Sequence, residues 1–280
     1  MPFIGAHVST AGGVANGLIR GTELGVEAIQ IFGSSPRQWG VSLPTEKTLA
    51  EWEKASKETT VKTVFLHAPY LANIGHPDPE MREKSIQALA GHLRIADMLH
   101  SDGLIFHIGS GKGEEREPAL KRVVDGMREV LSRVPGKTRL IIENSAGEGD
   151  KIGSTLEEIA DIIKRIGDVR VRVCIDTAHA FASGMISEYT KKNLDQFAKH
   201  IEATIGKEAL VALHVNDSKV PTGAKVDRHE NIGEGHIGID GFRALAKEKI
   251  VGSIAWLLEV PGFDGRGPDK KNVELLRSCL

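Results

Sequence analysis

The sequence contains little cysteine: Cys174 and Cys279 are its only two, and more than a hundred residues separate them. A disulfide framework or a cysteine-rich zinc site is therefore excluded. Any metal ion that this protein binds must be held by nitrogen and oxygen ligands.

Long hydrophobic runs and a basic leader are also missing from the N-terminus, and its apolar stretch is far too short for a signal peptide or a membrane span. We therefore expect a cytoplasmic protein that has no contact with membranes. No linker rich in Pro, Gly or Ser interrupts the chain, so we expect residues 1–280 to form a single domain. This length suits a β/α barrel built around one core.

The sequence has no large excess of charge of either sign, and its formal net charge is −2 at pH 7. Taken alone, this value argues against a protein that holds nucleic acid by bulk electrostatic attraction. The hydrophobic share of 40% and the charged share of 26% are close to those of ordinary globular proteins. A compact, folded protein is indicated.

A short aliphatic run, a turn and a longer helical pattern recur along the chain. We predict eight strands at residues 3–8, 28–32, 64–67, 104–107, 140–143, 171–176, 210–214 and 254–259. Helical stretches, with apolar residues three and four apart, include residues 80–99, 118–133, 156–166 and 194–205. The nearly continuous apolar strands are typical of a parallel sheet buried on both faces. The pattern predicts an α/β fold, a closed (β/α)8 TIM-type barrel, although an open doubly wound sheet shows the same alternation.

Six of the predicted strands end in a side chain that can bind metal, and three further candidates lie just beyond strand ends. The nine residues are His67, His107, Glu143, Asp176, His179, His214, Asp227, His229 and Glu259. In a parallel barrel all strand C-termini open on one face, where active sites of this fold lie. We therefore expect these residues to converge at one mouth.

A single histidine after an apolar run, such as His67, is more often a hydrogen-bonded core or rim residue than a ligand. Nine such groups in one pocket without a bound cation would cost much free energy, because unpaired buried charges are costly and like charges repel. Bound cations relieve that cost. Nine ligands exceed what one catalytic zinc ion needs, so two or three ions are expected. Imidazole with carboxylate favours Zn²⁺, with Mn²⁺ or Fe²⁺ as substitutes, over Mg²⁺.

The remaining histidines fit other roles. His7 ends the first strand, and we expect it to hydrogen-bond beside the ligands. His236 lies in a glycine-rich loop and fits either role. The others, which are His76, His92, His100 and His200, are expected to be surface or packing residues.

At these positions the sequence resembles the endonuclease IV family of apurinic/apyrimidinic endonucleases. The resemblance spans the whole chain and rests on residues 5–9, 36–39, 67–70, 107, 109–110, 142–147, 175–181, 214–219, 227–236 and 258–259. It departs from the family pattern at Ala178, where Cys is expected, at Ile108, where Pro is common, and at residues 184–187, which lack the usual Tyr-Asp. No departure removes a candidate ligand, but together they affect the fine shape of the pocket.

The resemblance implies a TIM-type barrel with three zinc ions. By it, His67 and His107 hold one ion and Glu143 bridges to a second, which also takes Asp176, His214 and Glu259. His179, Asp227 and His229 hold the third ion. The spacing of the residues finds the nine ligands, whereas this grouping is implied by the family alone.

The resemblance also implies hydrolysis of the phosphodiester bond 5' to an abasic site in double-stranded DNA, which leaves a 3'-hydroxyl, and trimming of blocked 3' ends. Clustered divalent ions can activate water and neutralise the developing charge, and Glu143 is the expected catalytic residue. Extrusion of the lesion costs least where no base is stacked or paired. Arg37, Gln38 and Tyr70 are the expected DNA wedge residues, and Lys219 and Arg228 are weaker candidates for phosphate contacts.

Two other functions remain open at this point. Related barrels that isomerise or epimerise sugars also place His, Glu and Asp at strand ends, but they use fewer ligands and no wedge loop. A DNA-damage binder without catalytic activity would leave nine costly side chains without a task. A monomer is expected.

Overall fold

The computed structural model describes residues 1–280, whose main sheet is a closed barrel of eight parallel strands. The strands are β1 (Phe3–His7), β2 (Ala28–Phe32), β3 (Thr63–His67), β4 (Gly103–His107), β5 (Leu140–Glu143), β6 (Val171–Asp176), β7 (Leu210–His214) and β10 (Ala255–Leu258). The barrel closes where β1 pairs with β10 on one side and with β2 on the other. The closed (β/α)8 barrel expected from the sequence is confirmed, and the strand ends differ from prediction by one residue at most.

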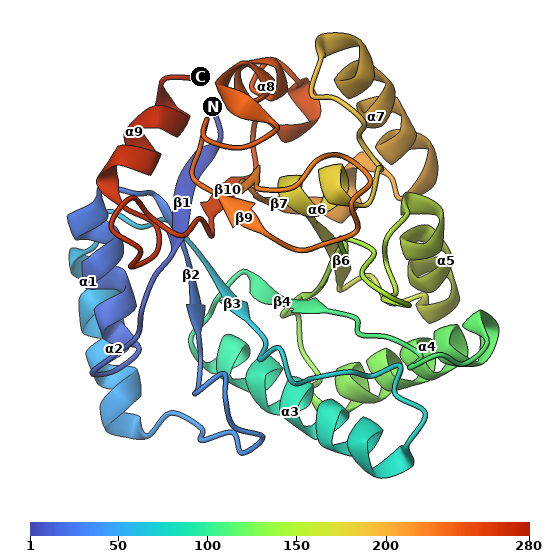
Figure 1. Cartoon of the computed structure of the whole chain (residues 1–280). Helices are drawn as coiled ribbons and strands as arrows, with labels where there is room; N and C mark the ends of the chain where they lie inside the picture. The colour runs from blue at the N-terminus through green and yellow to red at the C-terminus, as the bar shows by residue number, and fades with distance from the viewer.

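Helices surround the ring of strands in Figure 1, and the two chain termini lie near each other. The helices are α1 (Ala15–Leu24), α2 (Glu46–Glu58), α3 (Pro79–Met98), α4 (Arg116–Arg133), α5 (Leu156–Ile166), α6 (Thr177–Ala182), α7 (Lys191–Thr204), α8 (Gly238–Leu245) and α9 (Lys270–Arg277), with short 3-10 turns at Lys207–Ala209 and Lys249–Val251. None of these helices is both long and apolar enough to span a bilayer.

Capping residues explain where several helices begin. The Asp78 carboxylate accepts hydrogen bonds from the backbone N–H groups of Glu80 and Met81, and α3 starts at Pro79. Thr155 caps α5 in the same way, and α5 ends at Gly167, whose φ of 70° suits a residue without a Cβ atom. Local signals of this kind fix the helix ends independently of the barrel.

A small, separate core fills the inside of the barrel. Its members are Ala28, Phe65, Ile105, Ile141, Cys174, Ala212, Ala255 and Leu257. The residues that alternate with them pack outward against the helices in a cluster of 60 buried residues. Because side chains of a strand alternate between the two faces, the residue two positions after an inward-facing one also faces inward. This periodicity decides which side chains reach the mouth of the barrel.

A two-stranded antiparallel ladder, which the sequence did not predict, lies outside the barrel. It pairs β8 (Asp217–Ser218) with β9 (His229–Glu230). The ladder brings the loop that follows β7 back toward the barrel mouth. Two of the nine candidate ligands, Asp227 and His229, are on this returning segment.

His92 on α3 is fully buried, and neither of its ring nitrogens has a hydrogen-bond partner. Burial lowers the pKa of His92 to about 4. Between the unfolded-state value of about 6.5 and this folded-state value, only the unfolded chain binds the proton. The free energy of unfolding therefore falls as the pH falls through this window.

We predict that the His92→Leu variant loses this pH dependence. Urea unfolding of the metal-free proteins at pH 7.5 and pH 4.5 should show the wild type losing up to about 3 kcal/mol more than the variant. At pH 7.5 the variant should be at least as stable as the wild type, because leucine leaves no polar atom unpaired. Parallel pH dependence in the two proteins would contradict this account.

Candidate metal centre

Each of the eight barrel strands delivers one polar side chain to the mouth of the barrel. Seven of these follow an inward-facing core residue by two positions, as His67 follows Phe65 and Glu143 follows Ile141. The eight side chains are His7, Gln30, His67, His107, Glu143, Asp176, His214 and Glu259. Most are almost completely buried. The expected convergence at the C-terminal face is therefore present, and strand periodicity is its cause.

The first cluster of possible ligands consists of His67, His107 and Glu143. Glu143 Oε2 lies 3.1 Å from His67 Nε2 and 3.5 Å from His107 Nδ1. The two imidazole rings lie side by side, with centroids 5.3 Å apart. One carboxylate oxygen thus faces two ring nitrogens across a space of the size that a metal ion needs.

The second cluster uses the other oxygen of the same carboxylate. Glu143 Oε1 lies 3.0 Å from His214 Nδ1, which is also 3.1 Å from Glu259 Oε2. Asp176 completes this cluster, with its Oδ2 atom 4.0 Å from His214 Nδ1. Glu143 therefore lies between the first and second clusters and turns one oxygen toward each.

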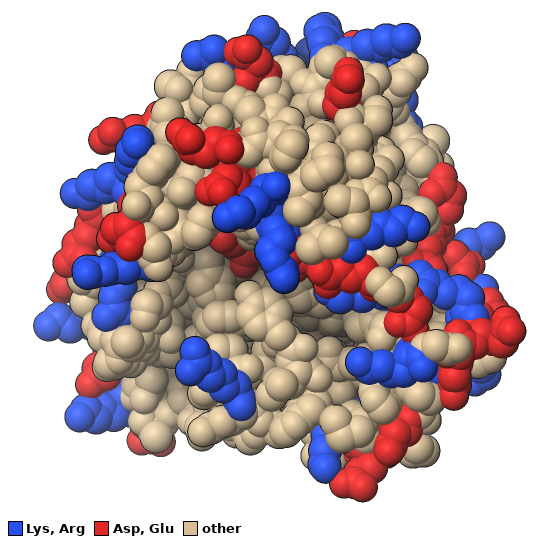
Figure 2. Space-filling view, viewed as in Figure 1, with Lys and Arg blue, Asp and Glu red and all other residues tan.

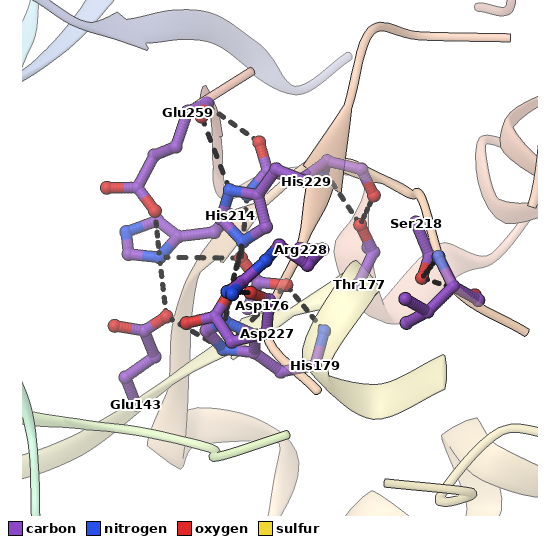
Figure 3. A network of polar contacts seen from close by, with 12 residues as sticks. Glu143, Asp176, Thr177, His179, His214, Ser218, Asp227, Arg228, His229 and Glu259 are labelled. Atoms are coloured by element: carbon purple, nitrogen blue, oxygen red, sulfur yellow. Dashed lines mark hydrogen bonds and ion pairs between the residues drawn. The ribbon is translucent and has the colours of Figure 1, made fainter. Parts of the chain in front are cut away.

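The third cluster lies at the side of the mouth nearest α6, as Figure 3 shows. Asp227 Oδ1 lies 3.1 Å from His179 Nε2 and 3.4 Å from His229 Nε2. Asp176 also reaches this group, since its Oδ2 atom is 3.5 Å from His229 Nε2. The structure thus brings all nine expected ligands together, and it places Asp176 beside two clusters where the family grouping uses it in one.

Backbone carbonyl groups orient three of the imidazole rings. Nδ1 of His67 lies 2.7 Å from the carbonyl oxygen of Ala68, and Nδ1 of His179 lies 3.0 Å from that of Asn144. Nδ1 of His229 is 3.3 Å from the carbonyl oxygen of Glu259. Because a carbonyl oxygen only accepts, each Nδ1 must carry the proton. The Nε2 atom of each ring, which faces its cluster, is then free to bind a metal ion.

The buried carboxylates hold their negative charge through their imidazole neighbours. Burial alone would raise the pKa of Glu143, but His107 and His214 lower it well below the usual value. Burial also opposes ionisation of Asp227, but the hydrogen bond from His179, together with the charges of His179, His229 and His107, outweighs it and lowers the pKa. These side chains are therefore ionised at neutral pH.

The pKa values of two imidazoles, His179 and His214, are shifted in the opposite direction. Burial disfavours the charged form of His179, but Asp176 and Asp227 raise its pKa well above the usual value. Around His214, burial is likewise outweighed by acidic groups that include Glu259, and the pKa is raised. Without metal, protons bound to these imidazoles balance part of the carboxylate charge.

A buried carboxylate, Asp217, organises the loop that carries the third cluster. Its oxygens accept hydrogen bonds of 2.9 to 3.1 Å from the backbone N–H groups of Gly233, Gly235, Ile237 and Gly238. A Cβ atom at position 235 would lie 2.5 Å from Asp217 Oδ1, so glycine is required there. At the other end of the segment, Glu148 accepts a hydrogen bond of 2.9 Å from the N–H of Asp227. The sequence gives no signal for these contacts beyond the cluster of glycines.

The donor set fits metal ions. The ligand atoms lie within 4.8 Å of one another in three groups, which are His67, His107 and Glu143; Glu143, Asp176, His214 and Glu259; and Asp176, His179 and His229. Asp227 adjoins the last group. Imidazole nitrogen mixed with carboxylate oxygen is the ligand set of zinc, manganese and iron sites. The arrangement matches a centre for three ions, in which Glu143 is shared between two.

The residues expected to contact DNA lie at the rim. Arg37 and Gln38 are exposed in the loop after β2, and Tyr70 is 65% exposed with its ring stacked against that of His107, at a centroid distance of 5.8 Å. Lys219 and Arg228 are at or near the β8–β9 ladder, where the Arg228 guanidinium donates to the carbonyl oxygen of Asp227.

A groove of about 1150 Å³ adjoins the metal-ligand candidates. Its lining includes His7, Tyr70, Glu259, Arg266 and Lys270. Figure 2 shows this face hollowed near its centre, with basic and acidic side chains around the hollow. The groove thus has charged residues of both signs in its lining and includes the candidate ligand Glu259.

The other histidines lie outside the three clusters. His7 Nδ1 is 3.4 Å from Glu259 Oε1, beside the second cluster. His236 is exposed, and the remaining four, His76, His92, His100 and His200, lie on α3, on α7 or in the turns before and after α3.

Comparisons with known proteins agree with this arrangement. Residues 20–279 match the model of a family described as xylose isomerase-like TIM barrel. A probable endonuclease 4 of Aquifex aeolicus is 37% identical over 281 residues, which cover 99% of this chain and 97% of the relative. A probable endonuclease 4 of Carboxydothermus hydrogenoformans is 36% identical, with 92% and 90% covered.

Solved structures show the same relationship. The crystal structure of endonuclease IV from Thermus thermophilus superposes with a TM-score of 0.87 at 29% identity, covering 99% of this chain and 98% of that one. A D-tagatose 3-epimerase-like protein gives a TM-score of 0.73 at 17% identity, covering 99% and 96%. The second likeness shows the barrel fold alone.

Metal binding to the metal-free protein should release protons. His179 and His214 have raised pKa values, so at pH 7 they are protonated, and a ligand nitrogen must lose its proton to bind a cation. We expect about two protons per chain at pH 7, measured by calorimetric Zn²⁺ titration in buffers of different ionisation enthalpy. The release should fall as the pH rises through these pKa values. Heats that do not depend on the buffer would show that the imidazoles are already neutral.

Proposed function

The chain belongs to the endonuclease 4 family of xylose isomerase-like TIM barrels, and from this membership we propose that it is a DNA repair nuclease. It hydrolyses the phosphodiester bond 5' to an abasic site and leaves a 3'-hydroxyl and a 5'-deoxyribose phosphate. The same site trims blocked 3' ends during base excision repair. The observation that supports this most strongly is the third cluster, His179, Asp227 and His229, which adjoins two others.

The proposed cofactors are three Zn²⁺ ions, with Mn²⁺ or Fe²⁺ as substitutes. His67 and His107 hold the first, Asp176, His214 and Glu259 the second, and the third cluster the last, with Glu143 shared by the first two. When bound, such ions polarise a phosphate, lower the pKa of water and neutralise charge on the attacking and leaving oxygens.

Glu143 is the proposed catalytic residue. It is ionised at neutral pH because neighbouring imidazoles lower its pKa, and each of its two oxygens faces a different cluster. A carboxylate in this position orients a water molecule between the clusters and accepts its proton. Because Glu143 is only 1% exposed, bulk water does not compete for that hydrogen bond.

The proposed substrate is double-stranded DNA that contains an abasic site or a blocked 3' end. Arg37 and Gln38 project from the loop after β2, and Tyr70 presents an exposed ring directly above the ligand His107. These side chains wedge into the duplex and hold the extruded sugar at the mouth. Extrusion costs least where a base is already missing, which favours the abasic nucleotide.

Every candidate ligand comes from one chain, so the site is complete without a partner subunit. We therefore propose that residues 1–280 act as a single-domain monomer. Light scattering at several protein concentrations tests this directly.

A sugar isomerase or epimerase of the same barrel class is the alternative. The epimerase-like structures share only the fold at 17% identity. A cluster carried by a loop outside the barrel strands, and an exposed polar loop after β2, are the features that favour the nuclease.

The decisive experiment uses metal-replete protein and a duplex with one abasic analogue, beside an undamaged duplex. We expect a single cut 5' to the lesion, which a chelator abolishes and which is absent from the undamaged duplex.

The Glu143→Gln variant should lower kcat by about 10²- to 10⁴-fold, because a general base contributes on that scale. Glu234→Gln, an exposed carboxylate in the glycine-rich loop, is the matched control and should cut normally. No cut by the metal-loaded wild type would move the assignment to the sugar isomerase.

The wedge residues are tested by a fluorescent base analogue. 2-Aminopurine next to the lesion brightens when it unstacks, and we expect Arg37→Ala and Tyr70→Ala to reduce this signal and to lower kcat/KM by about 10-fold, the loss expected from about 1.4 kcal/mol of transition-state contact. Their zinc content should match that of the wild type. Lys192→Ala, an exposed cation on α7, serves as the control. Wild-type fluorescence and kinetics in both variants would remove the wedge role.

Metal removal should weaken DNA binding, whatever its effect on cleavage. Three divalent ions bring the formal net charge from −2, counted with neutral histidines, to +4; because about two protons leave on binding, the gain is about four charges. All of that charge falls at the mouth, so the ions create the anion-binding surface. Fluorescence anisotropy with a non-cleavable abasic duplex should show affinity at least about 10-fold lower after chelation, and a smaller dependence on salt. Equal affinities would mean that side chains alone bind the DNA.

A further inference from the structure

Gln30, on β2, lies at the mouth of the barrel among the candidate ligands, but it belongs to none of the three clusters. It is fully buried, and its amide contacts three side chains that come from three other strands or strand ends. Its Oε1 atom lies 2.8 Å from His214 Nε2, and its Nε2 atom lies 2.5 Å from Glu259 Oε1 and 2.9 Å from His7 Nδ1. Every polar atom of this side chain therefore has a partner.

The chemistry of the neighbours fixes the orientation of the amide. Glu259 carries a carboxylate, which only accepts hydrogen bonds, so the NH₂ group of Gln30 must face it. The carbonyl oxygen then faces His214, and it can only accept. It follows that, in the neutral ring that can bind a cation, Nε2 of His214 carries the proton and Nδ1 has the free lone pair. Nδ1 is the atom that points into the second cluster, toward Glu143 and Glu259.

Because of the same contacts, the two carboxylate oxygens of Glu259 have different partners. Oε1 accepts from the Gln30 amide, while Oε2 lies 3.1 Å from His214 Nδ1, inside the second cluster. Gln30 thus determines which nitrogen of one ligand and which oxygen of another are offered to a cation. The second hydrogen of its NH₂ group points to His7 Nδ1, which holds the amide in place.

This arrangement differs from that of His67, His179 and His229, whose outer nitrogens donate to backbone carbonyl oxygens. For His214 the acceptor is a side chain, so a single substitution can remove it. We propose that Gln30 is a positioning residue for the second metal site, where it holds His214 in the Nε2–H form and turns Oε2 of Glu259 toward the ion. This rests on the proposed metal-dependent function, but it concerns metal binding alone.

The test compares the wild type with Gln30→Met, which has similar length and volume but none of the three hydrogen bonds. Competition with a chromophoric chelator measures the affinity for each zinc ion. We expect one of the three zinc ions to be bound about 10- to 100-fold more weakly in the variant, the usual cost of losing a hydrogen bond to a metal ligand. In the metal-free protein, at a pH high enough for the His214 ring to be neutral, ¹⁵N NMR of the imidazoles should show His214 as Nε2–H in the wild type and as a mixture of forms in Gln30→Met.

Two further variants separate positioning from plain destabilisation. Trp52→Phe removes the buried hydrogen bond from the indole N–H to the carbonyl oxygen of Leu99, away from the mouth, and should lower stability without changing zinc affinity. Gln30→Glu keeps the acceptor for His214 but replaces the amide donors. At a pH where the His214 ring is neutral it should retain the Nε2–H form, and it should bind the same zinc ion more weakly. It also decides the matter if Gln30→Met does not fold.

Unchanged zinc affinity in the Gln30 variants, or an unchanged His214 form in Gln30→Met, would overturn the proposal. Because both measurements are made without DNA, they are independent of the cleavage assay. A wild type that fails to cut abasic DNA but shows the expected zinc and NMR changes would refute the nuclease function and leave the role of Gln30 standing.

Discussion

The charge of a single buried carboxylate, Glu143, determines which groups can surround it at the barrel mouth. Its two oxygens face different groups of imidazoles, so the first and second clusters share this one side chain. Burying it costs free energy unless positive charge lies close by, whether from protonated imidazole or from metal ions. The imidazoles in turn are oriented by backbone carbonyl groups and by the Gln30 amide. The stability of the buried carboxylate therefore depends on residues that do not contact it.

The fold and the identity of the ligands could be predicted from the sequence to a large extent. Strands such as 140–143 are apolar until a charged residue ends them, and the closure of parallel strands brings those end residues together. The grouping of the ligands could not be read from spacing, because it depends on how strands far apart in the sequence pair around the ring. The family resemblance supplied the grouping, and the structure adds that Asp176 stands beside two clusters.

Other features depend on contacts that no local pattern encodes. Gln30 is an ordinary polar residue in an apolar strand until the barrel closes and brings Glu259 beside it. The β8–β9 ladder and the four N–H groups that bind Asp217 arise from a loop that returns to the mouth, and only its glycines hint at such a turn. This returning segment, which lies outside the barrel strands, carries two of the nine candidate ligands, Asp227 and His229.

The pairing of the first strand with the last has a consequence for the order in which the protein folds. Contacts such as Phe3 with Ala255, and Gln30 with Glu259, join residues separated by most of the chain. Contacts of such high sequence separation form late, because a long loop must close before they are made. A partly folded chain therefore lacks the contacts of Gln30 and His7 with Glu259, and the second cluster takes its final geometry only when the barrel closes.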